Sequence, residues 1–198
     1  VGDFMDNNHI TYTSPTFDLG GAQVTLDLGY ASDANDTETG DGGVPGGGTY
    51  GSGTEAGITI AYDAFKFGIY GAERENNRTS AAGVDAVRDE FNGVWYAKYS
   101  FGPVSIGYSE SYLDSGVSET QTVGTTTAKT LRTSGGIFEG EQIGIAFNVN
   151  DNFSVSYSES TETYNAQSEA ASQDVDQKTD SIQFAYSMGG MSIKAYQI

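Results

Sequence analysis

Apolar and polar residues alternate with a period of two over most of the chain, the pattern of β-strands that have one apolar and one polar face. The clearest example is the segment 91–112, FNGVWYAKYSFGPVSIGYSESY, in which two alternating runs meet at a Gly-Pro turn at 102–103. In the second run Val104, Ile106 and Tyr108 alternate with small or polar residues. This segment predicts an antiparallel hairpin with one large apolar face and one small polar face.

The same alternation predicts four more hairpins, each with a short turn rich in Gly, Asp or Asn. They lie at about 9–31, 56–69, 143–157 and 182–195. Segments rich in Gly, Ser, Thr and acidic residues separate the hairpins, near 32–54, 73–90, 114–136 and 159–178. Because such segments cannot bury enough apolar surface to fold alone, we expect long exposed loops. Tight turns that alternate with long loops predict an all-β, antiparallel up-and-down transmembrane β-barrel, with about ten strands present in one domain.

Two kinds of fold accommodate a sheet that has one apolar and one polar face. A soluble sandwich buries the apolar face against a second sheet, whereas a membrane barrel turns that face to lipid and keeps its polar face for a wet interior. The hydrophobic content of 37% and the mean hydropathy of -0.39 favour the barrel, because only alternate strand residues then need to be apolar. The alternative is a soluble or cell-surface β protein with a structural or adhesive role.

Aromatic residues fall into two groups along the predicted strands. The group near the tight turns is Phe17, Tyr62, Phe65, Phe101, Phe147, Phe153 and Tyr186, and the group near the loops is Tyr30, Tyr70, Phe91, Tyr112 and Tyr157. A membrane barrel carries an aromatic girdle at each interface, so we expect these groups to be the two girdles. The alternative explanation is the general preference of Tyr and Phe for strands.

Charge and cysteine content exclude several classes of function. The 27 acidic and 9 basic residues give a formal charge of -18, which argues against nucleic acid as a partner and favours cations. With 0 cysteines the chain has no disulfide, thiolate metal site or cysteine nucleophile. It also has no run of about 18 apolar residues, which excludes a transmembrane helix.

Catalysis and metal binding have weak support in the sequence. His9 is the 1 histidine, so a Ser-His or Asp-His enzyme built on a membrane barrel would depend on it alone, and we interpret it as a polar strand residue of a protein that is not an enzyme. A run of acidic residues is spaced like calcium ligands, although an EF-hand requires glycine at the position of Glu38. These residues are Asp33, Asp36, Glu38 and Asp41. We interpret the run as a solvated loop, with weak binding of a divalent cation such as Ca²⁺ as the alternative, and we expect no other cofactor.

The segment 2–31 contains Asp6-Asn7-Asn8 and then ITYTSPTF at 10–17. It resembles the part of Gram-negative general-diffusion porins where the chain leaves the inward-folded constriction loop and forms the next hairpin. The resemblance covers about a sixth of the sequence. It implies a channel that passes small hydrophilic solutes and ions. It further implies that the protein is a homotrimer in the cell outer membrane, surrounded by lipid and lipopolysaccharide. It also implies that the early strands and the closing strand of a barrel of roughly 16 strands lie outside this chain.

The resemblance makes residues 1–8 the end of the constriction loop, so Asp3 and Asp6 are candidate carboxylates at the narrowest point of the pore. The polar faces of the predicted strands supply the other pore candidates: Thr11, Thr13, Thr25, Asp27, Lys66, Lys98 and Lys194. The acidic excess predicts a preference for cations that fades as salt rises. For Asp6 the alternative is a capping role in the turn before the first strand.

Overall fold

The computed structural model describes residues 9–32, 50–76, 84–86, 88–119, 136–165, 175–189 and 191–197. The strands are β1 (His9–Thr13), β2 (Phe17–Leu19), β3 (Ala22–Ala31), β4 (Tyr50–Tyr62), β5 (Phe65–Asn76), β6 (Val84–Ala86), β7 (Glu90–Phe101), β8 (Val104–Asp114), β9 (Val117–Glu119), β10 (Ile137–Asn150), β11 (Phe153–Asn165), β12 (Val175–Met188) and β13 (Met191–Gln197). No helix in this part of the chain is long and apolar enough to cross a membrane.

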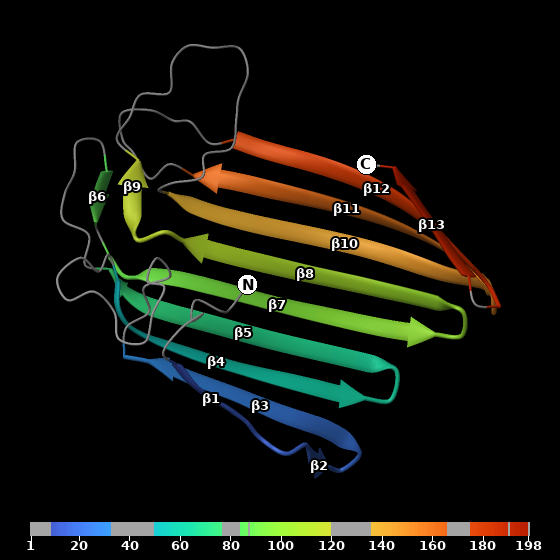
Figure 1. Cartoon of the computed structure of the whole chain (residues 1–198), viewed down its shortest axis with the longest axis horizontal. Coiled ribbons are helices and arrows are strands. Elements are labelled where there is room, and N and C mark those ends of the chain that lie inside the picture. Colours follow the sequence, from blue (N-terminus) through green and yellow to red (C-terminus); the bar gives the residue numbers. More distant parts are fainter. Residues whose placement is uncertain are drawn as a thin grey trace.

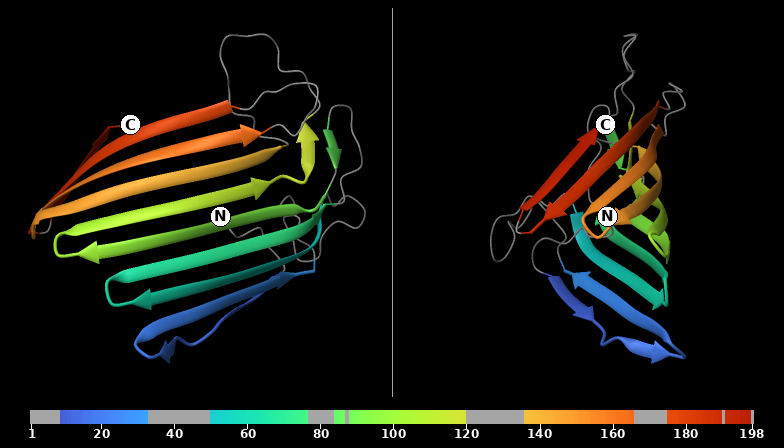
Figure 2. Two further views of the ribbon diagram at one scale, coloured as in Figure 1. Left: turned by 180° about the vertical axis from the view of Figure 1, so that it is seen from behind. Right: turned by 90° about the vertical axis from the view of Figure 1, so that its right-hand side faces the viewer.

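Most of these strands form a single antiparallel sheet. Its order is β1-β3-β4-β5-β7-β8-β10-β11-β12-β13, with β2 also paired to β3, and β6 and β9 form a separate pair (Figure 1). Seen along the strands, the sheet curls into a trough whose two margins turn toward the same side (Figure 2). The predicted all-β, up-and-down architecture and its five hairpins are confirmed.

The hairpin turns follow from local sequence. Gly20 and Gly21 both have positive φ, at 67° and 94°, which the primed turns of tight hairpins require and glycine adopts without strain. On the other side of this hairpin Pro15 interrupts the pairing partner of β3, which is therefore split into β1 and β2. Ser14 bridges the break, because its hydroxyl accepts a hydrogen bond from the Leu26 amide at 2.9 Å.

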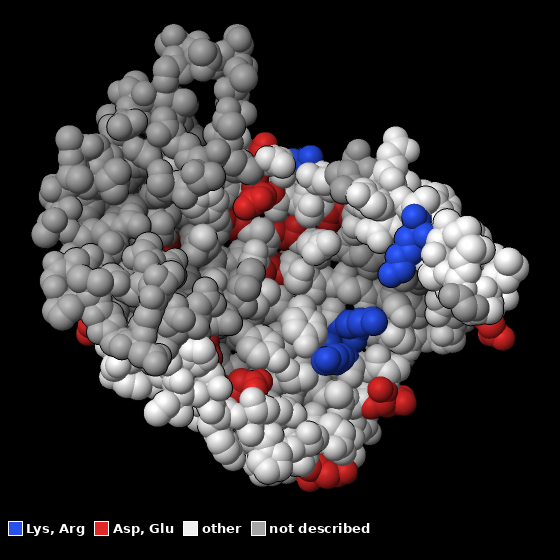
Figure 3. Space-filling model, viewed as in Figure 1, with Lys and Arg blue, Asp and Glu red and all other residues white. Residues whose placement is uncertain are grey.

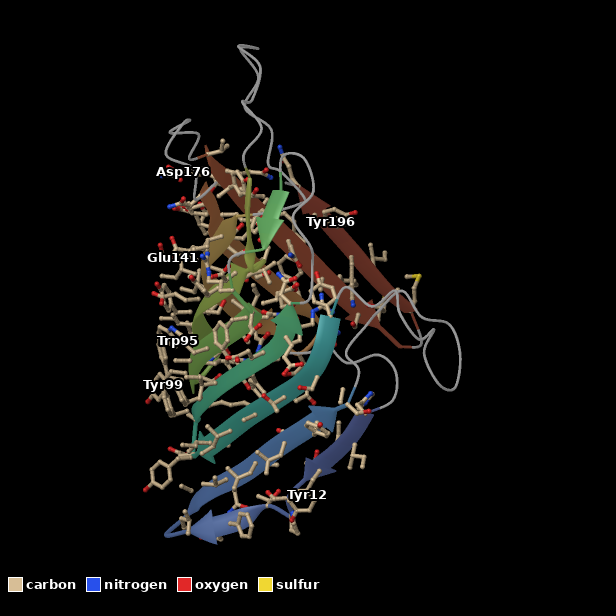
Figure 4. All side chains as sticks on the ribbon, turned by 90° about the vertical axis from the view of Figure 1, so that its left-hand side faces the viewer. Tyr12, Trp95, Tyr99, Glu141, Asp176 and Tyr196 are labelled. Atoms are coloured by element: carbon tan, nitrogen blue, oxygen red, sulfur yellow. The ribbon has the colours of Figure 1, made fainter. Side chains whose placement is uncertain are left out.

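The strand register sorts side chains onto two faces. Tyr99, Ile106 and Ile145 are direct cross-strand neighbours, and the row continues through Tyr157. Figure 4 shows Trp95 and Tyr99 on the convex side of the sheet. The convex face is thus the apolar one, and its side chains are exposed: Ile145 is 46% accessible.

Four strands are longer than the sequence predicted. The loops expected near 32–54, 73–90 and 159–178 are each partly strand, since β4 begins at Tyr50, β5 reaches Asn76, β11 reaches Asn165 and β12 begins at Val175. The strands β6 and β9, which pair with each other, also lie inside expected loops. The predicted boundaries were wrong because regular alternation of apolar and polar residues ends before the strand does. Beyond that point apolar residues such as Tyr50, Tyr164 and Val175 stand singly among polar ones, while the backbone ladder continues.

Packing is densest where the strands meet the loops. Tyr164 is 1% accessible and packs with Val175 and Phe138. The Arg74 guanidinium lies 3.5 Å from the centre of the Tyr50 ring and forms an ion pair with Glu90 at 3.1 Å. These contacts hold the first residues of β4, β7 and β12 against the ends of the neighbouring strands.

A second ion pair joins the segment before β7 to the end of β8. The Asp114 carboxylate accepts a hydrogen bond from Arg88, and this bond raises the pKa of the guanidinium above its usual value. Because arginine is charged at any physiological pH, the contact joins two opposite charges over that whole range.

Candidate pore-lining face

The concave face of the trough is the candidate site, and it is made of small and polar side chains. One row crosses the sheet from β5 to β12 by direct cross-strand pairing, and its members are Lys66, Lys98, Gly107, Gly144, Ser158 and Ser181. The next row toward the loops consists of Thr59, Gly68, Tyr96, Ser109, Gln142, Ser160 and Thr179. Hydroxyl and amide groups in such numbers suit a wall in contact with water.

The structure brings the described pore candidates onto this face. Thr13 lies opposite Asp27 and donates a hydrogen bond to its carboxylate at 2.7 Å. The Thr25 hydroxyl lies 3.3 Å from that of Thr16. The other candidates on the concave face are Thr11, Lys66, Lys98 and Lys194. The candidates Asp3, Asp6, Asp33, Asp36, Glu38 and Asp41 lie outside the described residues, so their roles stay predictions.

A tyrosine on this face was not predicted there. Tyr70 was assigned to an aromatic girdle, and that assignment is wrong: it pairs with Gly57 on the concave face, and its hydroxyl shares a hydrogen bond with that of Thr59. A Cβ on Gly57 would lie 2.1 Å from the Tyr70 ring, so the ring rests where the glycine leaves space. Counting alternate residues from Phe65 would have placed Tyr70 inward.

Tyr96 repeats this arrangement one strand further along. Its ring covers Gly68, where an added Cβ would meet a ring carbon at 2.4 Å. An aromatic ring over a cross-strand glycine restores the contact that the missing side chain would have made. Both rings therefore lie along the wall and leave the interior of the trough open.

Acidic residues form a band on the opposite, convex face, between the apolar residues and the loops. This acidic collar consists of Glu110, Glu139, Glu141, Glu159, Asp176 and Asp180, all of them exposed. Figure 4 shows Glu141 and Asp176 pointing away from the trough. The sequence analysis missed the collar because it had assigned Glu159 and Asp176 to a loop, and because these carboxylates become neighbours only through the register between strands.

Aromatic donors mark the boundary between the apolar residues and the collar. The Trp95 indole donates to Glu110 at 2.9 Å. The Tyr108 hydroxyl contacts both Glu110 at 2.6 Å and Glu141 at 2.9 Å. An amphipathic ring with its polar end hydrogen-bonded outward is the arrangement found where a membrane surface meets water.

No family model and no curated protein match the sequence. A solved structure, a porin refined at 1.8 Å resolution, matches with a TM-score of 0.52 and 13% identity over 95% of this chain. The chain has a porin-like fold. The match covers 56% of that porin, so this chain spans about half of its length.

The porin-like sheet has two edges among the described strands, since β1 and β13 each pair on one side only. His9 lies on the concave face opposite Ala31 and is exposed. In the described part of the chain no group of three or more His, Asp or Glu residues is placed to hold a metal ion.

Proposed function

We propose that this chain forms part of the wall of a Gram-negative outer-membrane porin, a water-filled channel through which small hydrophilic solutes and ions diffuse. The observation that supports this most is the pairing of an exposed apolar convex face with a hydroxyl-rich concave face on one curved sheet. In lipid the first face avoids water and the second lines the channel. The proposal includes neither an enzymatic reaction nor a cofactor, and Ca²⁺ binding at Asp33 to Asp41 is only a weak alternative.

A soluble role fits the same faces less well. The large exposed hydrophobic residues include Leu28 at 52%, Ile143 at 52% and Ile193 at 54%. They lie on the same face of strands from one end of the sheet to the other, which is far more than the scattered apolar residues of an ordinary soluble surface. A sandwich would need a second sheet of equal size to cover them.

The open edges require partners in a membrane. Unpaired backbone groups of β1 and β13 would each cost several kcal/mol in hydrocarbon, so only a closed barrel is stable there. We propose that further strands of a longer protein close the barrel, as the resemblance to general-diffusion porins implies. A homotrimer surrounded by lipopolysaccharide is the assembly that this resemblance suggests.

Selectivity for cations is part of the proposal. We propose that the acidic groups responsible for it lie at the mouth and at the constriction of the channel. The charges of the described concave wall nearly balance: the acidic residues are Asp18, Asp27, Glu55, Glu90 and Glu162, and the basic residues are Arg74, Lys66, Lys98 and Lys194. The acidic excess of the whole chain thus lies elsewhere: on the convex face, in turns such as those at Asp63 and Asp151, and in segments outside the described residues. Asp3 and Asp6 are the candidates nearest the constriction.

Reconstitution of the full-length protein in planar lipid bilayers tests the function. We expect ohmic, water-filled channels with a reversal potential that favours cations at low salt and loses this preference as salt rises. Asp3→Asn with Asp6→Asn should reduce the preference more than neutralising Asp33, Asp36, Glu38 and Asp41 together, because a constriction forces ions within a Debye length of about 8 Å. Release from membranes by salt alone, with no channels, would contradict the proposal.

A further inference from the structure

Two lysines face each other directly on the concave wall. Lys66 on β5 pairs with Lys98 on β7, and both side chains are exposed. Directly opposed residues of antiparallel strands have Cβ atoms only about 4.5–5.5 Å apart, and like charges in this position destabilise a sheet. The pair therefore concentrates positive charge at one point of the wall, at a cost to stability.

No carboxylate neutralises this lysine pair in the described structure. Neither lysine forms an ion pair there. Among the concave-face carboxylates, Asp18 stands in the same row but three strand spacings of about 4.8 Å away, and it accepts hydrogen bonds from Gly21 and Gln23. Asp27 and Glu162 stand in a row four residues closer to the loops. Four residues span about 13 Å, which exceeds the Debye length of about 8 Å at physiological salt. Asp63, in the turn before β5, is close in sequence and also makes no ion pair with the lysines.

Space for a solute lies beside Lys98, the member of the pair that lines it. Gly107 and Gly144 follow Lys98 in the same row and contribute no side chains, which leaves a groove of about 350 Å³. Hydroxyl and amide groups on its sides belong to Ser105, Ser109, Gln142, Ser156 and Ser158. Figure 3, which looks onto the concave face, shows basic residues in the half nearer the tight turns, and acidic residues in the hollow nearer the loops and at the outer rim.

We propose that Lys66 and Lys98 form a binding site for small, doubly charged oxyanions, the chemical class of phosphate and its monoesters. Two ammonium groups supply two charges and up to six donors, and neighbouring hydroxyls can donate to the remaining oxygens. Because the site is open to water, binding is weak and reversible, as passage through a channel requires. The inference rests on the proposed channel, and it adds a local anion site to a pore whose overall preference is for cations.

Inorganic phosphate in its doubly charged form is the probe. In bilayers, phosphate added to the wild-type protein should reduce the single-channel chloride current in a saturable way, and in detergent it should bind by calorimetry. Lys66→Gln should weaken both effects roughly tenfold, the loss of one hydrogen bond to a charged group. Lys66→Arg should restore them.

Lys194→Gln is the matched control, because it removes the same charge from the same face at a position opposite Ala185 instead of a second lysine. It should change phosphate affinity less than twofold. Equal weakening by Lys66→Gln and Lys194→Gln would overturn the site, and so would channels that conduct while phosphate neither blocks nor binds. Phosphate binding that depends on Lys66 in a protein without channel activity would support the site and overturn the channel.

Discussion

Whether a side chain faces the convex or the concave side decides which substitutions it tolerates. Ile145 lies between Ile106 and Tyr157 in the apolar row, whereas Ser154 lies opposite Asn148 and Ala185 on the polar wall. In the proposed barrel, a cation in the first position would have to enter hydrocarbon, and a cation in the second would meet water. Residues one position apart along a strand therefore differ more in their tolerance of a charged substitution than distant residues on the same face do.

Arginine substitutions measure this difference. Ile145→Arg should lower the free energy of unfolding in lipid vesicles by about 2–4 kcal/mol, the cost of a cation near the bilayer midplane. Ser154→Arg should leave stability nearly unchanged and alter conductance. Leu26→Arg and Thr25→Arg form an independent pair on β3 with the same expectation. Equal stability of the two members of both pairs would refute the assignment of faces.

At the scale of the strands, the last long strands of the sheet have more residues than a crossing of the hydrocarbon would need. β10 and β12 have 14 residues and β11 has 13. A strand tilted by about 45° needs only about 9–11 residues to cross the hydrocarbon. The surplus lies at the loop end, where the outward residues are those of the acidic collar. In the proposed barrel each of these strands would continue beyond the hydrocarbon, with the acidic collar on its outer face and buried residues such as Tyr164 and Val175 on its inner face.

Hydrogen exchange tests these extensions. Amides of Glu159–Asn165 in β11 should be protected to a degree comparable with Phe153–Tyr157, because both stretches pair on two sides with β10 and β12. The turn at Asp151-Asn152 is the internal reference for fast exchange. Exchange of 159–165 at the rate of that turn would mean that the strand ends where the sequence pattern ends.

Much of this fold could be predicted because its signal is local. Alternation within each hairpin gave the turns, the faces and the pore candidates such as Thr25 and Lys98. The strand extensions could not be predicted from the same signal, because apolar residues stop alternating before the backbone pairing ends. The lysine pair was equally hidden, since residues 66 and 98 meet only through the register between two hairpins, which no local pattern specifies.

At the scale of the whole molecule, the net charge of -18 is a poor guide to the charge of the channel wall. The described concave face is nearly neutral, with lysines toward the tight turns and all its carboxylates except Asp18 toward the loops, while the collar faces outward. A solute in the proposed pore would meet acidic groups first and the lysine pair deeper inside. The channel account depends on one assignment, which face meets water and which meets lipid.

Thiol accessibility tests this assignment most directly, because the sequence has 0 cysteines and single ones can be introduced without background. Ser156→Cys and Ile145→Cys place a thiol on the concave and convex faces of neighbouring strands. In lipid vesicles, a charged water-soluble maleimide should label Ser156→Cys rapidly and Ile145→Cys hardly at all, and an apolar fluorophore on Ile145→Cys should be quenched by brominated lipid. Labelling of Ile145→Cys by the charged reagent, with quenching by lipid at residue 156 instead, would contradict the account.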